Sequence, residues 1–190
     1  MTHNASFEYE MCKDGDQIYN EYDGKTYTYT RWLLRMDLAT TKETSTSVEG
    51  TMTVYFIRDT AAVKGGYSFG TQNQFTAWVN GTQVYHSDNL GRIEIPSGTR
   101  TEYKLWSGTW SGAKDSSGKF SQTFSAKFRQ PQREKPWSGT VSGTFTIDAE
   151  SNLYVYVNGK WRLGTPYVYT TAGWKKSTGK TSVYKDGWKK

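Results

Sequence analysis

The chain has 190 residues, a formal net charge of +6 and one cysteine, Cys12. A single cysteine excludes an internal disulfide and a cysteine-based metal site. The sequence also lacks an apolar run of about 20 residues, the length needed to span a bilayer. Its first residues, MTHNASFEYEMCKDGD, lack the apolar core of a secretory signal peptide. We therefore expect a protein made in the cytoplasm, with no membrane span.

The composition favours strands over helices. Only 35% of the residues are hydrophobic, yet 16% are aromatic, supplied by 14 Tyr, 8 Trp and 8 Phe. Tyr and Trp suit half-buried pleated surfaces and contact faces for sugars or proteins. No window shows the apolar spacing of a long amphipathic helix. An all-β fold follows.

Residues 1–26 form the first section of the chain. They are polar and weakly patterned, and KDGD and YDGK within them are typical of turns. Such a segment lacks the apolar residues for a core of its own. We expect it to be irregular and to attach the protein to a larger assembly.

Residues 27–149 show period-2 alternation of apolar and polar residues, which is typical of strands with one buried face. Seven segments carry it: 27–38, 51–57, 75–79, 83–86, 92–96, 120–128 and 139–148. Gly, Asn, Asp and Ser turns separate them. The pattern predicts one antiparallel β-sandwich, Ig-like or jelly-roll-like. Its predicted inward side chains are Trp32, Leu34, Met36, Leu38, Met52, Val54, Phe56, Phe75, Ala77, Val79, Phe120, Phe124, Ala126, Phe128, Val141, Phe145 and Ile147.

Residues 150–190 contain three copies of one short sequence motif: Val-Tyr, a turn with glycine, then Trp. The copies place Trp161, Trp174 and Trp188 at intervals of 13 and 14 residues. Each predicts a β-hairpin, with tight turns at Asn158-Gly159, Ala172-Gly173 and Asp186-Gly187. A hairpin this short cannot bury its aromatic face by itself. The copies must therefore stack on one another, on the sandwich or on partner subunits. The candidate site residues are Tyr156, Tyr169, Tyr184, Trp161, Trp174 and Trp188.

The basic charge belongs to the repeats. Residues 151–190 carry a formal charge of +7, which leaves −1 for the other 150 residues. This surplus either keeps the aromatic hairpins soluble or favours acidic partners such as phosphate-bearing glycopolymers, membranes or nucleic acid. The basic residues of the candidate site are Lys160, Arg162, Lys175, Lys176 and Lys185.

The aromatic residues of the repeats have two alternative roles. In the first they form the core of the repeats or an oligomer interface. In the second, at least one ring is an exposed platform on which a sugar stacks, while Lys and Asn side chains bond its hydroxyls or a phosphate.

Two stretches resemble known phage proteins. The first stretch is LWSGTWSGAKDSSGKFSQTFSAKF, followed by SGTVSGTFTID. It contains a D-x-x-G turn (Asp115, Gly118), an alternating aromatic strand (Phe120, Phe124, Phe128) and a strand of small residues (143–148). These features resemble the closing strands of Ig-like modules in minor structural and tail proteins of siphophages. The repeats VYVNGKW, VYTTAGW and VYKDGW resemble those at the C-terminal ends of phage minor structural proteins from Gram-positive hosts.

The resemblance implies a virion structural protein, made in the host cytoplasm and located in the virion. The expected role is a tail or fibre component that attaches to host cell-surface carbohydrate. The expected partners are other virion proteins, further copies of the chain and a host cell-wall glycopolymer, with no specific nucleic acid. One alternative is a capsid decoration or head fibre protein. Another is a bacterial cell-wall module, because GWKKSTGKTSVYKDGW is also similar to choline-binding repeats, although Thr181 and Ser182 stand where that family tends to have caging aromatics.

The sequence does not favour an enzyme. His3 and His86 are the only histidines, and we expect His3 in a mobile terminus and His86 at a strand end. Glycoside hydrolysis needs two converging carboxylates, and nothing marks Glu94 and Glu102 as such a pair. We expect no catalytic residue, metal or cofactor.

Overall fold

A computed structural model of the chain describes residues 2–20, 23–131 and 136–149, and the backbone of residues 153–157, 160–164, 167–170 and 173–176. Every regular element in these ranges is a β-strand, and all the strand pairs are antiparallel. The all-β prediction is therefore confirmed. The chain divides into two compact units, Met1–Asp148 and Ala149–Lys190.

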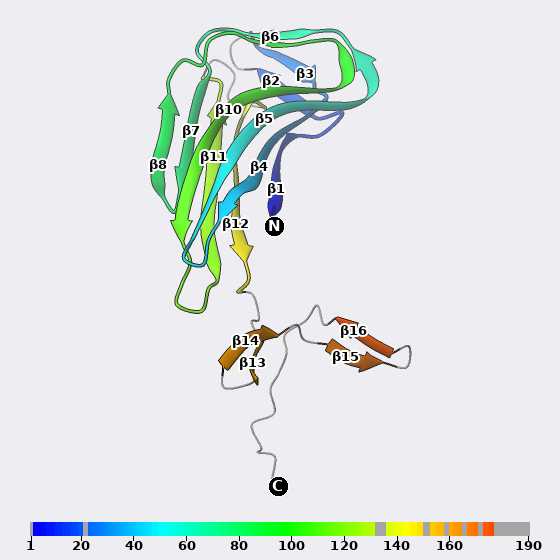
Figure 1. Cartoon of the computed structure of the whole chain (residues 1–190). Coiled ribbons are helices and arrows are strands. Elements are labelled where there is room, and N and C mark those ends of the chain that lie inside the picture. The colour runs from blue at the N-terminus through cyan, green and yellow to red at the C-terminus, as the bar shows by residue number, and fades with distance from the viewer. Residues whose placement is uncertain are drawn as a thin grey trace. The chain divides into compact units, whose positions relative to one another are not determined.

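The first unit is built from two four-stranded antiparallel sheets (Figure 1). One sheet has the strand order β1 (Asn4–Cys12), β4 (Arg31–Glu43), β5 (Ser47–Lys64) and β10 (Gly98–Ala113). The other has the order β12 (Ser138–Ile147), β11 (Phe120–Arg129), β7 (Gln74–Val79) and β8 (Thr82–Ser87).

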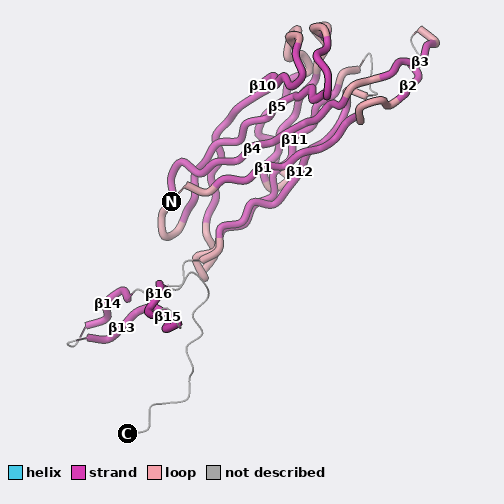
Figure 2. The backbone as a smooth tube through the Cα atoms, turned by 90° about the vertical axis from the view of Figure 1, so that its right-hand side faces the viewer, coloured by secondary structure: helices cyan, strands magenta, loops and turns pink. Residues whose placement is uncertain are grey.

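Two small antiparallel pairs lie at one end of these sheets. β2 (Gln17–Asn20) pairs with β3 (Lys25–Thr28) in a hairpin that projects from the sheets in Figure 2. β6 (Tyr67–Phe69) pairs with β9 (Ile93–Ile95), and the long strands β5 and β10 curve together toward this end (Figure 1). The chain therefore leaves the first sheet after β5, builds β7 and β8 in the second sheet, and returns to pair β10 with β5.

The core lies between the two sheets and is rich in aromatic rings. Phe56 of β5 lies 4.9 Å from Phe128 of β11 between ring centroids, and Trp110 of β10 lies 5.2 Å from Phe124 of β11. Every predicted inward side chain is buried except that of Val79, which is half-buried where β7 ends. Period-2 alternation therefore identified the buried face of each predicted strand.

The prediction of an irregular segment over residues 1–26 is wrong for Asn4–Cys12. These residues form β1, which pairs with β4 along the edge of the first sheet. Phe7 and Tyr9 pack on β12, where a Cβ at Gly143 would lie 2.1 Å from the Phe7 ring and one at Gly139 would lie 2.5 Å from the Tyr9 ring. The absence of side chains at these glycines lets β1 approach β12 and close one side of the sandwich. His3 is also tied to the sheet, because its backbone N–H donates to Thr40 Oγ1 at 2.7 Å.

The segment that became β10 was not predicted as a strand. Its inward positions alternate large and small residues, Trp106, Gly108, Trp110 and Gly112, so the apolar period is hidden. The glycines make room for rings, since a Cβ at Gly50 on the neighbouring strand would meet the Trp110 ring at 2.2 Å. Large and small residues interlock across the core here, which composition alone does not reveal.

Two turns follow from their residues. Asn80 and Gly81 have φ of 50° and 76° between β7 and β8, as a two-residue hairpin with left-handed positions requires. In the D-x-x-G turn, Asp115 Oδ1 accepts the backbone N–H groups of Ser117 and Lys119 at 2.9 and 3.0 Å. The Ser117 hydroxyl also donates to Asp115 Oδ1 at 2.7 Å, and this bond is the main reason that the pKa of Asp115 is lowered.

The part of the second unit that the structure describes consists of two hairpins. β13 (Leu153–Val157) pairs with β14 (Lys160–Gly164), and β15 (Tyr167–Thr170) pairs with β16 (Gly173–Lys176). Only their backbones are described, so they are characterised by register.

Candidate functional site

The two described hairpins of the C-terminal unit have equivalent registers. Tyr156 is the Cα partner of Trp161 in the first, and Tyr169 is the Cα partner of Trp174 in the second. The preceding valine pairs with a basic residue in each, Val155 with Arg162 and Val168 with Lys175. Directly opposed positions lie on the same face of a two-stranded sheet. The structure therefore brings together the predicted Tyr and Trp positions within each copy.

The two hairpins place their turns at equivalent positions, and one of the two predicted turns is displaced from its position by one residue. β13 ends at Val157 and β14 begins at its partner Lys160, which brackets the predicted Asn158-Gly159 turn. In the second hairpin Thr170 pairs with Gly173, so Gly173 is a strand residue and the predicted Ala172-Gly173 turn is wrong by one residue. The reason is that equivalent Tyr–Trp pairing leaves residues 171 and 172 between the strands. Tyr184, Lys185, Trp188 and the predicted Asp186-Gly187 turn lie outside the described residues.

The remaining sequence candidates lie apart on the sandwich. His86 Nδ1 lies 2.9 Å from Thr76 Oγ1, and Nε2 lies 3.2 Å from Asp88. His3 Nε2 lies 3.3 Å from Glu43. Within the described ranges, no three His, Cys, Asp or Glu side chains are grouped so as to hold a metal ion. No helix in those ranges is long and apolar enough to cross a membrane.

Glu94 and Glu102 are each engaged by arginines. Glu94 pairs with Arg92 at 3.1 Å. Glu102 receives two hydrogen bonds from Arg35, at 2.7 and 2.8 Å, and one from Arg100 at 3.2 Å. The Arg35 bonds are the main reason that the pKa of Glu102 is lowered. Glu102 therefore belongs to an ion-pair network.

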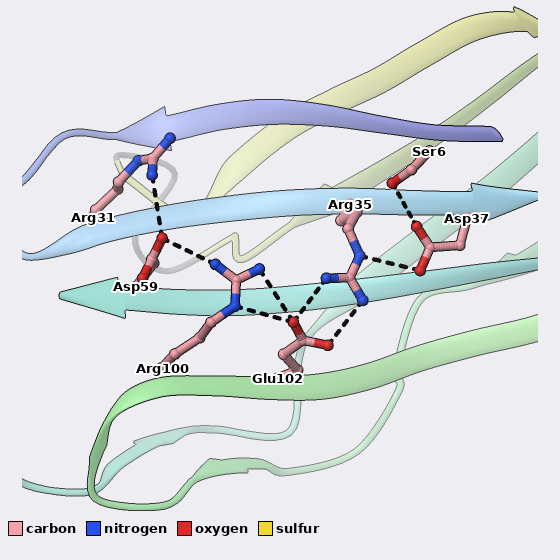
Figure 3. A network of polar contacts seen from close by, with 7 residues as sticks. All are labelled: Ser6, Arg31, Arg35, Asp37, Asp59, Arg100 and Glu102. Carbon is pink, nitrogen blue, oxygen red and sulfur yellow. Dashed lines mark hydrogen bonds and ion pairs between the residues drawn. The ribbon is translucent and has the colours of Figure 1, made fainter.

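That network covers the outer face of the first sheet (Figure 3). Arg31 and Arg100 share Asp59 at 3.2 and 3.0 Å, and Arg35 also reaches Asp37 at 3.1 Å. The hydrogen bond to Glu102 is the largest reason that the pKa of Arg35 is raised, and Glu10 does the same for Arg31. The charges neutralise one another, so the face does not present one strong sign of charge.

Two apolar residues lie beneath the charged side chains of this outer face. Leu33 and Ile57 are Cα partners, and their exposed fractions are 1% and 0%. Their positions alternate with Trp32 and Phe56 of the inner face, and arginine and tyrosine side chains flank them. Long arginine stems cover apolar surface while their charged ends remain in water. We therefore assign this network a structural role.

A pocket of aromatic residues lies at the end of the sandwich near β2, β3 and β6. Its volume is about 290 Å³. Its buried wall includes Trp32, Trp137 and Arg58, with exposed fractions of 2%, 1% and 2%. Tyr27 and Lys64 are exposed residues of the lining. Among the described residues, the lining consists of Tyr27, Thr28, Tyr29, Thr30, Trp32, Arg58, Lys64, Gly65, Tyr67 and Trp137.

The rings of this pocket contact one another edge-on or tilted. Trp137 lies 5.4 Å from Tyr29, 5.0 Å from Tyr67 and 6.2 Å from Trp32 between ring centroids. Such contacts hold each ring in one orientation. The pocket walls are therefore fixed by packing.

Sequence reasoning missed this pocket. The predicted strand over residues 51–57 ended one residue before Arg58, which continues the inward alternation of Val54 and Phe56. An arginine at an inward position was the available signal, because a fully buried arginine normally has a charged partner. The convergence of Trp137 with residues 27–32 and 64–67 depends on long-range packing and has no local signal.

No family model, no curated protein and no solved structure matches the chain.

Proposed function

We propose that the protein is a structural protein of a bacteriophage virion, a tail or fibre component whose C-terminal repeats attach to carbohydrate of the host cell surface. The observation that carries the proposal is the equivalent register of the two hairpins, Tyr156 opposite Trp161 and Tyr169 opposite Trp174. A register kept in both copies gives each the same pair of aromatic positions on one face. Repeated aromatic pairs suit a polymer whose sugar units recur.

The charge of the repeats supports an anionic polymer as the partner. The net charge of residues 151–190 is +7, and Arg162 and Lys175 occupy equivalent register positions in the two hairpins. Sugars stack on aromatic faces, while lysine and arginine bind phosphate or carboxylate groups. A cell-wall glycopolymer with phosphate or carboxylate groups presents both features.

One such site binds weakly, with a Kd on the order of 1 mM, or about −4 kcal/mol. Attachment therefore needs many copies on one particle, because tethering raises the effective concentration for each later contact. The charge contribution fades above about 0.15 M salt, where the screening length is about 8 Å. The stacking contribution persists at higher salt.

The test uses the purified full chain and its Trp161→Ala and Trp174→Ala variants on isolated Gram-positive cell walls. Each variant is first compared with the parent by circular dichroism. We expect both variants to fold and to lose retention on the walls. The control is Trp78→Ala, which removes a half-buried ring on the sandwich. If the Trp161→Ala and Trp174→Ala variants fold and are retained like the parent, the attachment proposal fails. If they unfold or lose assembly, the rings form a core or an oligomer interface.

The location on the virion is tested separately. Antibodies against the purified chain, with immunogold labelling and mass spectrometry of virions, distinguish a tail or fibre from a capsid decoration. Absence of the chain from virions would favour the alternative, a bacterial cell-wall binding module.

A further inference from the structure

The aromatic pocket of the sandwich contains a buried positive charge, and no carboxylate of the described residues opposes it. Arg58 donates from Nη1 to the Gly65 carbonyl at 2.6 Å and from Nη2 to the Pro96 carbonyl at 2.7 Å. A longer bond of 3.4 Å joins Nη2 to the Gly98 carbonyl. Arg58 forms no ion pair with an acidic residue of the described chain, whereas Arg31, Arg35, Arg92 and Arg100 all do.

Arg58 also has unused hydrogen-bonding capacity. A guanidinium has five N–H donors, and Arg58 Nε is buried without an acceptor. Burial lowers the pKa of Arg58 from its usual range, and the groups that face its charge are carbonyl oxygens and the Trp32 ring, whose centroid lies 6.0 Å away, with no carboxylate among the described residues. Removing a charge from water without a partner is costly, so such groups in folded proteins normally have a counter-ion.

The rest of the pocket favours an anion that carries a ring. Its lining contains no Asp or Glu among the residues that the structure describes, and Lys64 adds a second, exposed cation. Tyr27, Tyr29 and Tyr67 line the same space, and the Tyr27 hydroxyl donates to Asp23 Oδ2 at 2.6 Å. A volume of about 290 Å³ lies at the lower end of the range for small-molecule sites.

We propose that this pocket binds an acidic sugar, whose ring stacks on the tyrosine and tryptophan walls while its carboxylate or phosphate faces Arg58 and Lys64. The site is separate from the C-terminal repeats and concerns a second contact with acidic saccharides. Aromatic walls alone would bind any sugar ring that stacks on them, and cations alone would bind any small anion. Their combination in one pocket discriminates an acidic sugar from its neutral counterpart.

The test is saturation-transfer NMR on the full chain with three probes: glucuronate, glucose 6-phosphate and glucose. We expect a Kd on the order of 1 mM for at least one acidic probe, and binding of glucose at least about tenfold weaker, because buried or partly desolvated charge pairs contribute strongly. The stronger of the two acidic probes identifies the anionic group. Equal binding of glucose and both acids, or no binding of either acid, would overturn the proposal.

Variants place the binding in the pocket. Tyr27→Ala and Lys64→Gln alter exposed lining residues, and each should weaken the acidic probe by roughly twofold to tenfold. Tyr19→Ala removes a 60% exposed tyrosine from the same hairpin without changing the lining and should leave the affinity unchanged. Trp174→Ala should also leave it unchanged, which separates this site from the repeats. If Tyr27→Ala and Lys64→Gln bind like the parent, the pocket is not the site.

Arg58→Met tests the central charge. It is compared with the parent by circular dichroism, because three carbonyl groups lose their donor. If it folds, binding of the acidic probe should fall to the level of glucose. If it does not fold, two other results decide whether the pocket binds acidic sugars. They are the loss of affinity in Lys64→Gln and the ratio of the affinity for glucuronate to that for glucose.

Discussion

At the scale of single residues, the aromatic core determines the stability of the sandwich. Phe56 is fully buried, and its ring centroid lies 5.0 Å from that of Trp32, 5.2 Å from that of Phe69 and 4.9 Å from that of Phe128. These contacts link β4, β5, β6 and β11, so one ring joins the two sheets and the small pair at their end.

Phe56→Ala should lower the free energy of unfolding by roughly 3–5 kcal/mol, since it removes buried apolar surface and leaves a cavity. Urea unfolding followed by tryptophan fluorescence measures this loss. Tyr19→Ala, at a 60% exposed position, should change the free energy by less than about 0.5 kcal/mol. Equal losses in the two variants would contradict the assignment of the core.

A second effect at this scale depends on pH. Lys114 Nζ lies 2.6 Å from Glu43 Oε1, and the side-chain exposed fractions of the two residues are 9% and 20%. The hydrogen bond from Lys114 is the main reason that the pKa of Glu43 is lowered. A carboxyl group with a lowered pKa in the folded state stabilises the fold above the unfolded pKa, about 4.3, and this stabilisation is lost as pH falls through the folded pKa.

Glu43→Gln should therefore be less stable than the parent at pH 7, and the difference should shrink as pH falls below about 4.3. Urea midpoints between pH 7 and pH 3 measure the difference. The control Glu49→Gln removes an exposed pair with Lys42, which contributes little at any pH. A difference that stays constant down to pH 3 would show that the ion pair does not stabilise the fold.

At the scale of elements, the contact between β1 and β12 closes one side of the sandwich. The partners are rings on β1 and glycines on β12, so the contact requires the absence of side chains. Phe7 lies over Gly143, on a strand that is paired with β11 through Phe124. β12 therefore has little freedom to move away from an added side chain.

Gly143→Ala should destabilise the protein by roughly 1–3 kcal/mol through overpacking against the Phe7 ring. Gly65→Ala is the matched control, because nothing lies within 4 Å of a Cβ at Gly65. That change should be neutral or stabilise the protein by up to about 1 kcal/mol. Urea unfolding compares the two, and equal effects would mean that β1 does not pack on β12 as described.

The comparison of prediction with structure also belongs at this scale. Strands that alternate large apolar and polar residues, such as β4, β5 and β11, were predictable because a half-buried strand imposes period 2. β10 was missed because glycines interrupt its apolar period: Gly108 leaves room for Trp106 of the same strand, and Gly112 leaves room for side chains of β11. β1 was missed although Ala5, Phe7, Tyr9 and Met11 alternate with polar residues, because acidic residues and flanking turns dominate the segment.

The burial of residues on the outer face of a strand was equally unpredictable from the sequence. Leu33 and Ile57 stand at positions that period 2 assigns to solvent, and their burial depends on the flanking strands and on the charged side chains that share the outer face. The aromatic pocket was also unpredictable, because it forms only where four separate segments of the chain converge. By contrast, the predicted Asn158-Gly159 turn implies the observed pairing of Tyr156 with Trp161, whereas the predicted Ala172-Gly173 turn does not give the observed pairing of Tyr169 with Trp174.

At the scale of the whole molecule, charge and structure divide the chain at about the same place. Met1–Asp148 is one compact unit, and Ala149–Lys190 is the other. Residues 151–190 carry a net charge of +7, and the remaining 150 residues carry −1. The proposed attachment therefore depends mainly on the second unit, while the first supplies a folded body with its own pocket.

The most direct test compares the full chain with a protein that ends at residue 149, on the same isolated cell walls. Circular dichroism and the urea midpoint establish that the shorter protein keeps the sandwich. The account predicts that the shorter protein loses most of the retention and that the stronger of the two acidic probes, glucuronate or glucose 6-phosphate, displaces what remains. Retention of the folded shorter protein at the level of the full chain would contradict the account, because the repeats would then contribute nothing to attachment.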